Sequence, residues 1–257
     1  MTGGAVALAL GAALLHALWN LLLGGSRDVL AATAVALGSS LVLAAPVAVA
    51  TWDVQREAVP WLVASAALEL VYFFALAAAY QRAEVSLVYP IARGGAPVLV
   101  LAWSLAFGAE LGASEVAGVL AVAAGVVLVR GFGHGDRVGV VFGVVIALLI
   151  AAYTLVDSEG IEFADPVPYL LLILVPTTVA ATLATGPARL RAQLSSRTVL
   201  AGCAGFVAYV LVLAAYRLAP AAVVSAVRET SVLFSGRPYL KTISISALML
   251  SMFSVPS

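Results

Sequence analysis

The sequence is a succession of apolar stretches, each about as long as a helix that crosses a lipid bilayer. A helix rises about 1.5 Å per residue, so about 20 apolar residues span the hydrocarbon layer. We count nine clear stretches and a poorer tenth, joined by short connections. An all-α, polytopic membrane helical bundle is therefore predicted. The stretches lie near residues 2–23, 29–51, 60–80, 84–106, 114–130, 138–156, 167–185, 198–216 and 221–236, with the poorer one near 242–255.

The composition excludes two broad classes of protein. Hydrophobic residues make up 63% of the chain and charged residues 10%, whereas soluble domains contain about 45–50% and about 25%. The 13 Lys and Arg are balanced by 13 Asp and Glu, so no basic surface is available to hold nucleic acid. We therefore exclude a water-soluble protein, and nucleic acid as a partner.

Residues that carry catalytic or metal chemistry are scarce. Cys203 is the only cysteine, so neither a disulfide framework nor a thiolate metal site can be built. His16 and His134 are far apart in the sequence, and no nucleophile elbow or phosphate loop occurs. We expect no metal, no cofactor and no enzymatic activity.

Two segments resemble each other and indicate an internal repeat. Residues 13–22 (ALLHALWNLL) align with residues 147–156 (ALLIAAYTLV) at an offset of 134. The alignment places Trp19 on Tyr153. The two halves of the chain are therefore predicted to share one architecture.

A second match has an offset of 136 and places Phe73 on Tyr209. It defines two units of five spans each, residues 1–131 and residues 138–257. An odd number of spans forces the second unit to sit upside down relative to the first. Inverted repeats of this kind are typical of secondary transporters, whose substrate site lies near the midplane where the repeats meet.

Polar side chains within the apolar spans are the best candidates for function, because a charge at the bilayer centre costs roughly 2.5–3.5 kcal/mol. In the first span His16 and Asn20 are four residues apart and share a helix face, with Trp19 beside them. These residues would contact a polar substrate or a proton. The alternative is a hydrogen bond to a neighbouring helix.

The third span carries a carboxyl near the middle of the membrane. Glu69, Tyr72 and Phe73 begin a stripe on one helix face, and Glu69 lies about nine residues, or ~14 Å, past Pro60. Burial disfavours a charged carboxylate, so Glu69 can load and release a proton during transport. The alternative is that Glu69 is the fixed partner of an arginine.

The fourth span combines Pro90, Pro97, two adjacent glycines and Arg93. Neither proline can donate a backbone hydrogen bond, so we expect a bent or broken helix. Tyr89 and Arg93 share one face, and freed backbone groups are where transporters place polar ligand contacts. The alternative is a kink that serves packing only, with Arg93 snorkelling to the membrane surface.

The ninth and sixth spans supply the remaining charges. Arg228 and Glu229 lie at the depth in the second unit that corresponds to the fourth span. Adjacent helical residues point about 100° apart, so we expect that the two do not neutralise each other and that Arg228 pairs across the repeat interface. Tyr153 and Asp157 close the sixth span, with Asp157 expected at its aqueous end.

Three short runs resemble the EamA-type branch of the drug/metabolite transporter superfamily. They are residues 16–20 (HALWN), 86–94 (SLVYPIARG) and 151–157 (AAYTLVD), and the similarity covers about residues 5–234. The resemblance implies ten helices in two inverted five-helix units, no cofactor, and movement of a small metabolite by alternating access. It also implies that both termini are cytoplasmic.

The distribution of Lys and Arg predicts the opposite orientation, because positive residues in short loops favour the cytoplasm. With the N-terminus outside, nine loop cations are cytoplasmic and two, Arg56 and Arg217, are not. The nine are Arg27, Arg82, Arg130, Arg137, Arg189, Arg191, Arg197, Arg237 and Lys241.

The end of the chain departs from the family pattern. The first unit closes with a helix that follows residues 107–110 (FGAE), and an offset of 136 would carry the end of that helix to about residue 266, beyond Ser257. Residues 235–257 instead hold the only lysine and six serines. We infer a frameshift or an alternative ending; a divergent tenth helix is the other interpretation.

Together these patterns predict a multi-pass protein of the plasma (inner) membrane that transports a small polar, anionic metabolite by a secondary, non-ATP mechanism. The alternative is a non-transporting membrane component or a defective paralogue with a disrupted C-terminus. Partners would be the lipid bilayer, the substrate, and a proton or counter-substrate. A homodimer stays open. Gly139 and Gly143 form a Gly-x-x-x-Gly pair, but in a sequence this rich in small residues the pair says little about dimerisation. The candidate substrate-binding residues are His16, Trp19, Asn20, Glu69, Tyr72, Tyr89, Arg93, Tyr153, Arg228 and Glu229.

Overall fold

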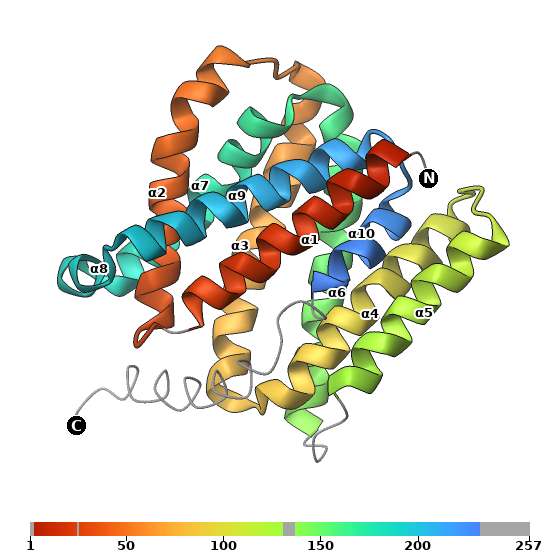
Figure 1. The fold of residues 1–257 in the computed structure, drawn as a ribbon, viewed down its shortest axis with the longest axis horizontal. Coiled ribbons are helices and arrows are strands. Elements are labelled where there is room, and N and C mark those ends of the chain that lie inside the picture. Colours follow the sequence, from red (N-terminus) through yellow and green to blue (C-terminus); the bar gives the residue numbers. More distant parts are fainter. Residues whose placement is uncertain (1–2, 25, 131–136, 232–257) are drawn as a thin grey trace.

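The computed structural model describes residues 3–24, 26–130 and 137–231, and Figure 1 shows them as a bundle of helices. Within these ranges the secondary structure is helical, apart from an isolated β-bridge between Val54 and Ala164. Two 3-10 turns, η1 (Arg56–Ala58) and η2 (Ile161–Phe163), precede α3 and α7. The α-helices are α1 (Gly3–Leu23), α2 (Val29–Ala50), α3 (Val59–Arg82), α4 (Val85–Ala106), α5 (Ala113–Arg130), α6 (Arg137–Gly160), α7 (Pro166–Thr185), α8 (Pro187–Gln193), α9 (Ser196–Tyr216) and α10 (Ala221–Glu229).

Seven of these helices are long and apolar enough to cross a membrane, namely α1 to α4, α6, α7 and α9. The expected all-α fold is confirmed for the described residues. The fifth expected span is α5, whose apolar part, Ala113–Val126, is shorter. The ninth begins as α10, near the end of the described residues. The expected tenth stretch near 242–255 and the unusual ending at 235–257 lie outside those residues.

A short helix that the apolar pattern did not predict, α8, lies between α7 and α9. Gly186 before it has φ +79°, a left-handed backbone that glycine adopts readily because it has no Cβ. Pro187 then occupies the first turn, where the missing N–H has no helical partner to lose. With 7 residues, α8 is too short to cross a bilayer, and it connects two spanning helices at one face of the bundle.

Successive spanning helices alternate in direction, so their connections fall on two opposite faces. The N-terminal face, where α1 begins, carries the α2–α3 and α6–α7 connections, which are joined by a hydrogen bond from the Gln55 N–H to the Phe163 carbonyl (3.0 Å). On the opposite face, here called the α8 face, Arg189 donates to both carboxylate oxygens of Asp28 at 2.8 and 3.1 Å. Figure 1 shows α8 beside the start of α2, far from the N-terminus.

Most loop cations gather on the α8 face. Arg56 and Arg217 lie at the N-terminal face, at the start of α3 and the end of α9. Arg237 and Lys241 lie outside the described residues. The other seven predicted cytoplasmic cations lie at the ends of helices that meet the α8 face or in α8 itself: Arg27, Arg82, Arg130, Arg137, Arg189, Arg191 and Arg197.

A reporter enzyme that is active only outside the cytoplasm tests the orientation that these cations predict. If the α8 face is cytoplasmic, a fusion just after Arg137 will be silent and a fusion near Asp165 will be active. Fusions after Arg82 and after Arg217 repeat the test at a second connection on each face. The reverse pattern at both pairs of sites would show that the orientation implied by the family resemblance holds.

The fourth span is one continuous helix, α4, although Pro90 and Pro97 lie inside it. Of the bent or broken helix expected from the two prolines, the break is therefore wrong, and the bend stays a prediction. Each proline removes a single backbone donor, and close packing against α6 supports the rest of the helix. At this contact an added Cβ on Gly95 would lie 3.3 Å from the Ala147 Cβ, so the two backbones approach closely.

The glycine pair in α6 faces the same helix of the same chain. An added Cβ on Gly139 would lie 2.8 Å from Leu87 of α4, and one on Gly143 would lie 2.8 Å from Ile91. The Gly-x-x-x-Gly pair thus brings α4 against α6 within the chain. It is not available as the surface of a homodimer.

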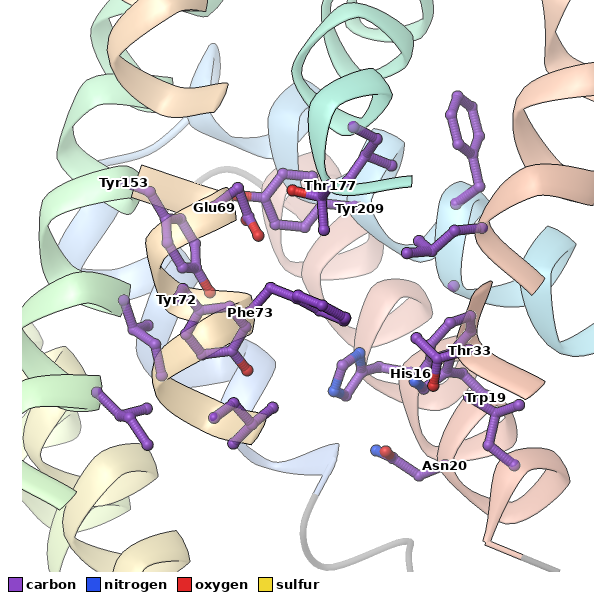
Figure 2. A pocket seen from close by; sticks show the side chains of 18 of the residues that line it. His16, Trp19, Asn20, Thr33, Glu69, Tyr72, Phe73, Tyr153, Thr177 and Tyr209 are labelled. Atoms are coloured by element: carbon purple, nitrogen blue, oxygen red, sulfur yellow. The ribbon is translucent and has the colours of Figure 1, made fainter. Parts of the chain in front are cut away.

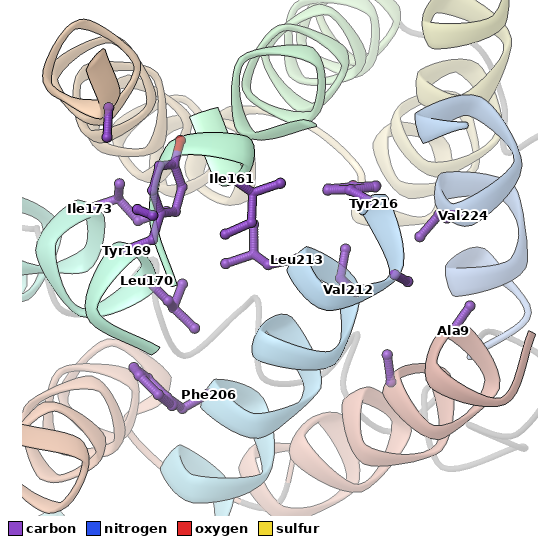
Figure 3. Packing of buried hydrophobic residues seen from close by; sticks show 14 residues of the cluster. Ala9, Ile161, Tyr169, Leu170, Ile173, Phe206, Val212, Leu213, Tyr216 and Val224 are labelled. Carbon is purple, nitrogen blue, oxygen red and sulfur yellow. The ribbon is translucent and has the colours of Figure 1, made fainter. Parts of the chain in front are cut away.

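A buried apolar cluster fills the bundle near the N-terminal face (Figure 3). It joins η2, α7 and α9 to α1 and α10 through residues such as Ala9 and Val224. The buried side chains of this cluster close this face of the bundle. Among its members that are at most 1% exposed, the largest are Ile161, Tyr169, Leu170, Ile173 and Leu213.

Gly205 of α9 packs directly on the indole ring of Trp19 in α1, and an added Cβ would collide with that ring. We expect Gly205→Ala to force the two helices apart and to lower the Tm of the purified protein in detergent, since overpacking costs about 1–3 kcal/mol. Gly118→Ala in α5 is the matched control, because a Cβ there meets nothing within 4 Å. Its Tm should stay level or rise. Equal Tm values for the two variants would contradict the close α1–α9 contact.

Candidate functional site

A cavity of about 350 Å³ lies between α1, α2, α3, α4, α6, α7, α9 and α10. The candidate residues chosen from helical spacing surround it, with the exception of Glu229, which lies behind the wall. The structure thus brings nine candidate residues together around one cavity. That they bind a substrate stays a prediction. The candidates that line the cavity are His16, Trp19, Asn20, Glu69, Tyr72, Tyr89, Arg93, Tyr153 and Arg228.

The cavity extends towards the α8 face. Its lining reaches Gly24 and Val29, on the two sides of the α1–α2 connection. At the N-terminal face the apolar cluster of Figure 3 fills the bundle. There Arg217 also donates to the carbonyl oxygens of Ile161 and Ala164 at 3.0 and 2.7 Å. In this conformation a ligand would enter from the α8 face.

Two arginines share one carboxylate beside the cavity. Arg93 Nη1 lies 3.3 Å from Glu229 Oε1, and Arg228 Nη2 lies 3.4 Å from the same oxygen. The Glu229 side chain is 1% exposed and the Arg228 side chain 5%. The formal charges of the three groups sum to +1. Among the described residues, the buried Nε of Arg228 has no hydrogen-bond acceptor.

Arg228 and Glu229 therefore do neutralise each other, contrary to the expectation from their positions on the helix. Their Cα–Cβ bonds diverge, but an arginine side chain is long enough for its guanidinium to fold back onto a neighbouring carboxylate. The contact across the two units is made instead by Arg93, which reaches Glu229. Snorkelling of Arg93 is not found, because its guanidinium faces Glu229 and lies 5.7 Å from the ring centre of Tyr89.

His16 joins the arginine cluster from α1. Its Nε2 lies 3.3 Å from Arg93 Nη2. A guanidinium can only donate, so Nε2 is the acceptor and the ring proton belongs on Nδ1. A neutral His16 thus forms a hydrogen bond to Arg93 of a neighbouring helix and also lines the cavity. The expected hydrogen bond between helices is therefore present, and contact with a substrate stays a prediction.

Glu69 lines the cavity without an ion pair or hydrogen bond to any residue that the structure describes. The alternative in which Glu69 is the fixed partner of an arginine is therefore wrong for this conformation. The physical reason is that α10 brings Glu229 within hydrogen-bond distance of Arg93, so Glu229 and not Glu69 is its partner. Glu69 stays half-buried at the cavity wall, where it can meet a proton or a ligand.

Aromatic and hydroxyl side chains complete the walls, and several were not among the candidates. Tyr72, Tyr153 and Tyr209 form a chain of edge-to-face rings with centroids 5.9 and 6.4 Å apart. Figure 2 shows Glu69 on the same side as these tyrosines, with His16 and the other labelled residues of α1 and α2 opposite. Tyr209 could have been predicted from the sequence, because the match at offset 136 aligns it with Phe73, which also lines the cavity. The added lining residues with polar or aromatic groups include Thr33, Ser40, Phe73, Thr177, Phe206 and Tyr209.

Asp157 does not lie at an aqueous end, as the sequence suggested, but is 0% exposed. It is three residues from the end of α6, yet side chains of α7 and α9 cover it there. Its carboxylate accepts hydrogen bonds from the hydroxyls of Tyr169 (3.0 Å) and Tyr209 (2.5 Å). The sequence position alone could not show that neighbouring helices extend beyond this residue.

The arrangement offers charge, hydrogen bonds and aromatic surface to a ligand. Within the described residues, no cluster of three or more His, Cys, Asp or Glu side chains could hold a metal ion. No protein-family model matches the chain, and no curated protein matches it.

Proposed function

We propose that this chain is a secondary transporter of the plasma (inner) membrane, which carries a small polar, anionic metabolite by alternating access. The observation that supports this most strongly is the pair of buried arginines, Arg93 and Arg228, that share the single carboxylate of Glu229 beside a cavity. Such a cluster is one negative charge short of neutrality.

Electrostatics favours an anion as the missing partner. A charged side chain at membrane depth costs roughly 2.5–3.5 kcal/mol unless it is paired or hydrated. The unpartnered Nε of Arg228 supplies a donor for an incoming oxygen, and charge-assisted hydrogen bonds of this type are the strong ones. A carboxylate or phosphate group on the substrate would complete both the charge balance and the hydrogen bonds.

The size and walls of the cavity favour a small molecule. Ligand pockets commonly measure about 300–1,000 Å³, so a cavity of about 350 Å³ suits a metabolite and not a peptide. Aromatic rings such as Trp19 and Phe73 would cover the less polar part of the substrate. The buried hydroxyl of Thr177, which has no partner among the residues that the structure describes, would accept or donate a hydrogen bond.

The packing of the helices supports two inverted repeats, residues 1–131 and 138–257, as the basis of alternating access. If α1, α2, α3 and α4 correspond to α6, α7, α9 and α10, the α1–α9 contact matches the α6–α3 contact. By the same rule the α2–α9 contact matches the α7–α3 contact, and the α4–α6 contact matches the α10–α1 contact. In addition, α2 contacts its own counterpart α7, and α4 contacts its own counterpart α10. This pattern of contacts is what a two-fold relation between the halves would produce.

Equivalent residues of the two halves also meet near the cavity. Arg93 and Glu229 are 136 positions apart, the offset of the second sequence match, so they contact each other as residues near a two-fold axis would. Phe73 and Tyr209, at the same offset, both line the cavity. These features agree with the EamA-type resemblance, which is proposed here as the family of the chain.

Flux measurements in reconstituted vesicles test the substrate class. We expect saturable uptake of one or more small organic anions, presented in a panel that also contains zwitterionic amino acids and organic cations of equal size. Vesicles without protein measure how fast each compound leaks through the lipid. Transport confined to cations, or no saturable flux from a correctly folded preparation, would contradict the proposal.

A further inference from the structure

A second carboxyl lies deep in the bundle, outside the arginine cluster. Asp157 of α6 is 0% exposed, and it forms no ion pair with any residue that the structure describes. Each of its two oxygens accepts one hydroxyl proton, from Tyr169 of α7 and from Tyr209 of α9. It is thus a buried acid held by hydrogen bonds alone.

A permanent charge at this position is hard to maintain. Burial of an isolated carboxylate is costly, and such groups are normally paired or become neutral. Two tyrosine hydroxyls stabilise the charged form, but they leave it without a countercharge in contact. The arrangement suits a group that is charged in one state of the protein and neutral in another.

The surrounding hydroxyls provide for the neutral form as well. Ser65 of α3 lies beside the Asp157 carboxyl, and within the described part of the chain its buried hydroxyl is not engaged in a well-formed hydrogen bond. A protonated Asp157 could donate to the Ser65 oxygen, so the site also has an acceptor for an additional proton.

Tyr209 connects this buried acid to the cavity. Its hydroxyl donates to Asp157, and the same residue lines the cavity together with Glu69. Figure 2 shows Tyr209 and Glu69 on the same side of the pocket. The ionisable groups that face Asp157 from the helices around it are Glu69 of α3, Tyr169 of α7, Tyr209 and Tyr216 of α9, and Arg228 of α10.

We propose that Asp157 is a second proton-binding site and exchanges its proton with Glu69 in the cavity through the hydroxyl of Tyr209. In the transfer, Asp157 gives its proton to the Tyr209 oxygen while Tyr209 releases its own proton towards the Glu69 carboxylate, directly or through water. One O–H bond breaks and one forms at Tyr209, so the net change is a neutral Glu69 and a charged Asp157. The role in coupling rests on the proposed transport function, whereas the proton binding does not.

Infrared difference spectroscopy after a change of pH tests the proton site without any substrate, since a protonated carboxyl has its own C=O stretching band. We expect the wild-type protein in lipid vesicles to show two buried carboxyl bands that respond to pH. Asp157→Asn should remove one, and Glu69→Gln the other. Asp53→Asn, the same change at an exposed aspartate on the N-terminal face, should leave both bands in place.

Tyr209→Phe keeps the carboxyl and removes one hydroxyl, so it tests the site even if Asp157→Asn does not fold. It should shift the frequency of the Asp157 band, because the band reports hydrogen bonding to the carboxyl. Retention of both bands in Asp157→Asn, or an unshifted spectrum in Tyr209→Phe, would overturn the inference. A response to Na⁺ at constant pH in place of a response to protons would overturn it too.

A transport measurement then separates the two levels of the proposal. With the best anion from the panel, Asp157→Asn should lose accumulation driven by a pH gradient and should retain exchange of labelled for unlabelled anion. Unchanged gradient-driven accumulation in this variant would refute a coupling role for Asp157. Absence of flux from wild type, with the infrared bands as expected, would refute the transport function and leave the proton site standing.

Discussion

Replacement of Glu229 by glutamine is expected to remove most of the stability of the protein. The change leaves the guanidinium groups of Arg93 and Arg228 without their shared countercharge, and both are largely buried. Breaking a buried ion pair by removing one partner costs about 3–5 kcal/mol. Since proteins are stable by only about 5–15 kcal/mol, we expect low yield and a large drop in Tm.

Thermal unfolding in detergent, followed by loss of the monodisperse species, measures this effect. Glu162→Gln is the matched control, because it makes the same chemical change at an exposed glutamate, and its Tm should stay near that of the wild type. If Glu229→Gln unfolded at the same temperature as the control, the shared-carboxylate arrangement would be refuted.

Replacement of Arg93 by glutamine is expected to separate stability from binding. The variant keeps one cation, Arg228, against one carboxylate, Glu229, so the buried charges balance and the protein should fold. It loses the surplus positive charge that attracts the substrate. A hydrogen bond to a charged group contributes about 1.5–3 kcal/mol, so the affinity for the anion should fall roughly ten- to hundredfold.

Concentration dependence of uptake in vesicles gives that affinity, with Arg56→Gln at an exposed position on the N-terminal face as the control. The double variant Arg93→Gln with Glu69→Gln decides between binding and mere neutralisation. If Arg93 served only to neutralise Glu69, the second change would restore stability and flux. We expect no such rescue, because Arg93 is paired with Glu229 and not with Glu69 in the structure, and changes at residues that share no bonding partner are usually additive.

The positions of the polar residues along the helices were enough to predict much of the cavity. Four-residue spacing placed His16 and Asn20 on one face, and the stripe that begins at Glu69 placed Tyr72 beside it; all four side chains line the cavity. Apolar length was equally informative, since seven of the expected spans are helices of spanning length. Both inferences depend only on the helical repeat, which is local.

Partner choice could not be predicted, because it depends on which helices meet. One alternative made Glu69 the fixed partner of an arginine, yet where α4 and α10 meet, Arg93 contacts Glu229. Asp157 was assigned to water because of its place near a helix end, but packing of α7 and α9 buries it. The α4 helix continues through Pro90 and Pro97 because its neighbour α6 packs closely against it.

Counterflow in reconstituted vesicles is the most direct test of a carrier with a cavity that opens alternately to the two sides. Vesicles loaded with an unlabelled anion from the panel are diluted into a trace of the same labelled anion. A carrier exchanges one for the other, so the labelled anion should accumulate transiently above its external concentration, and Arg93→Gln should strongly reduce this overshoot. A labelled anion that only equilibrates, or that enters equally fast with wild type, with Arg93→Gln and without protein, would contradict transport by this chain.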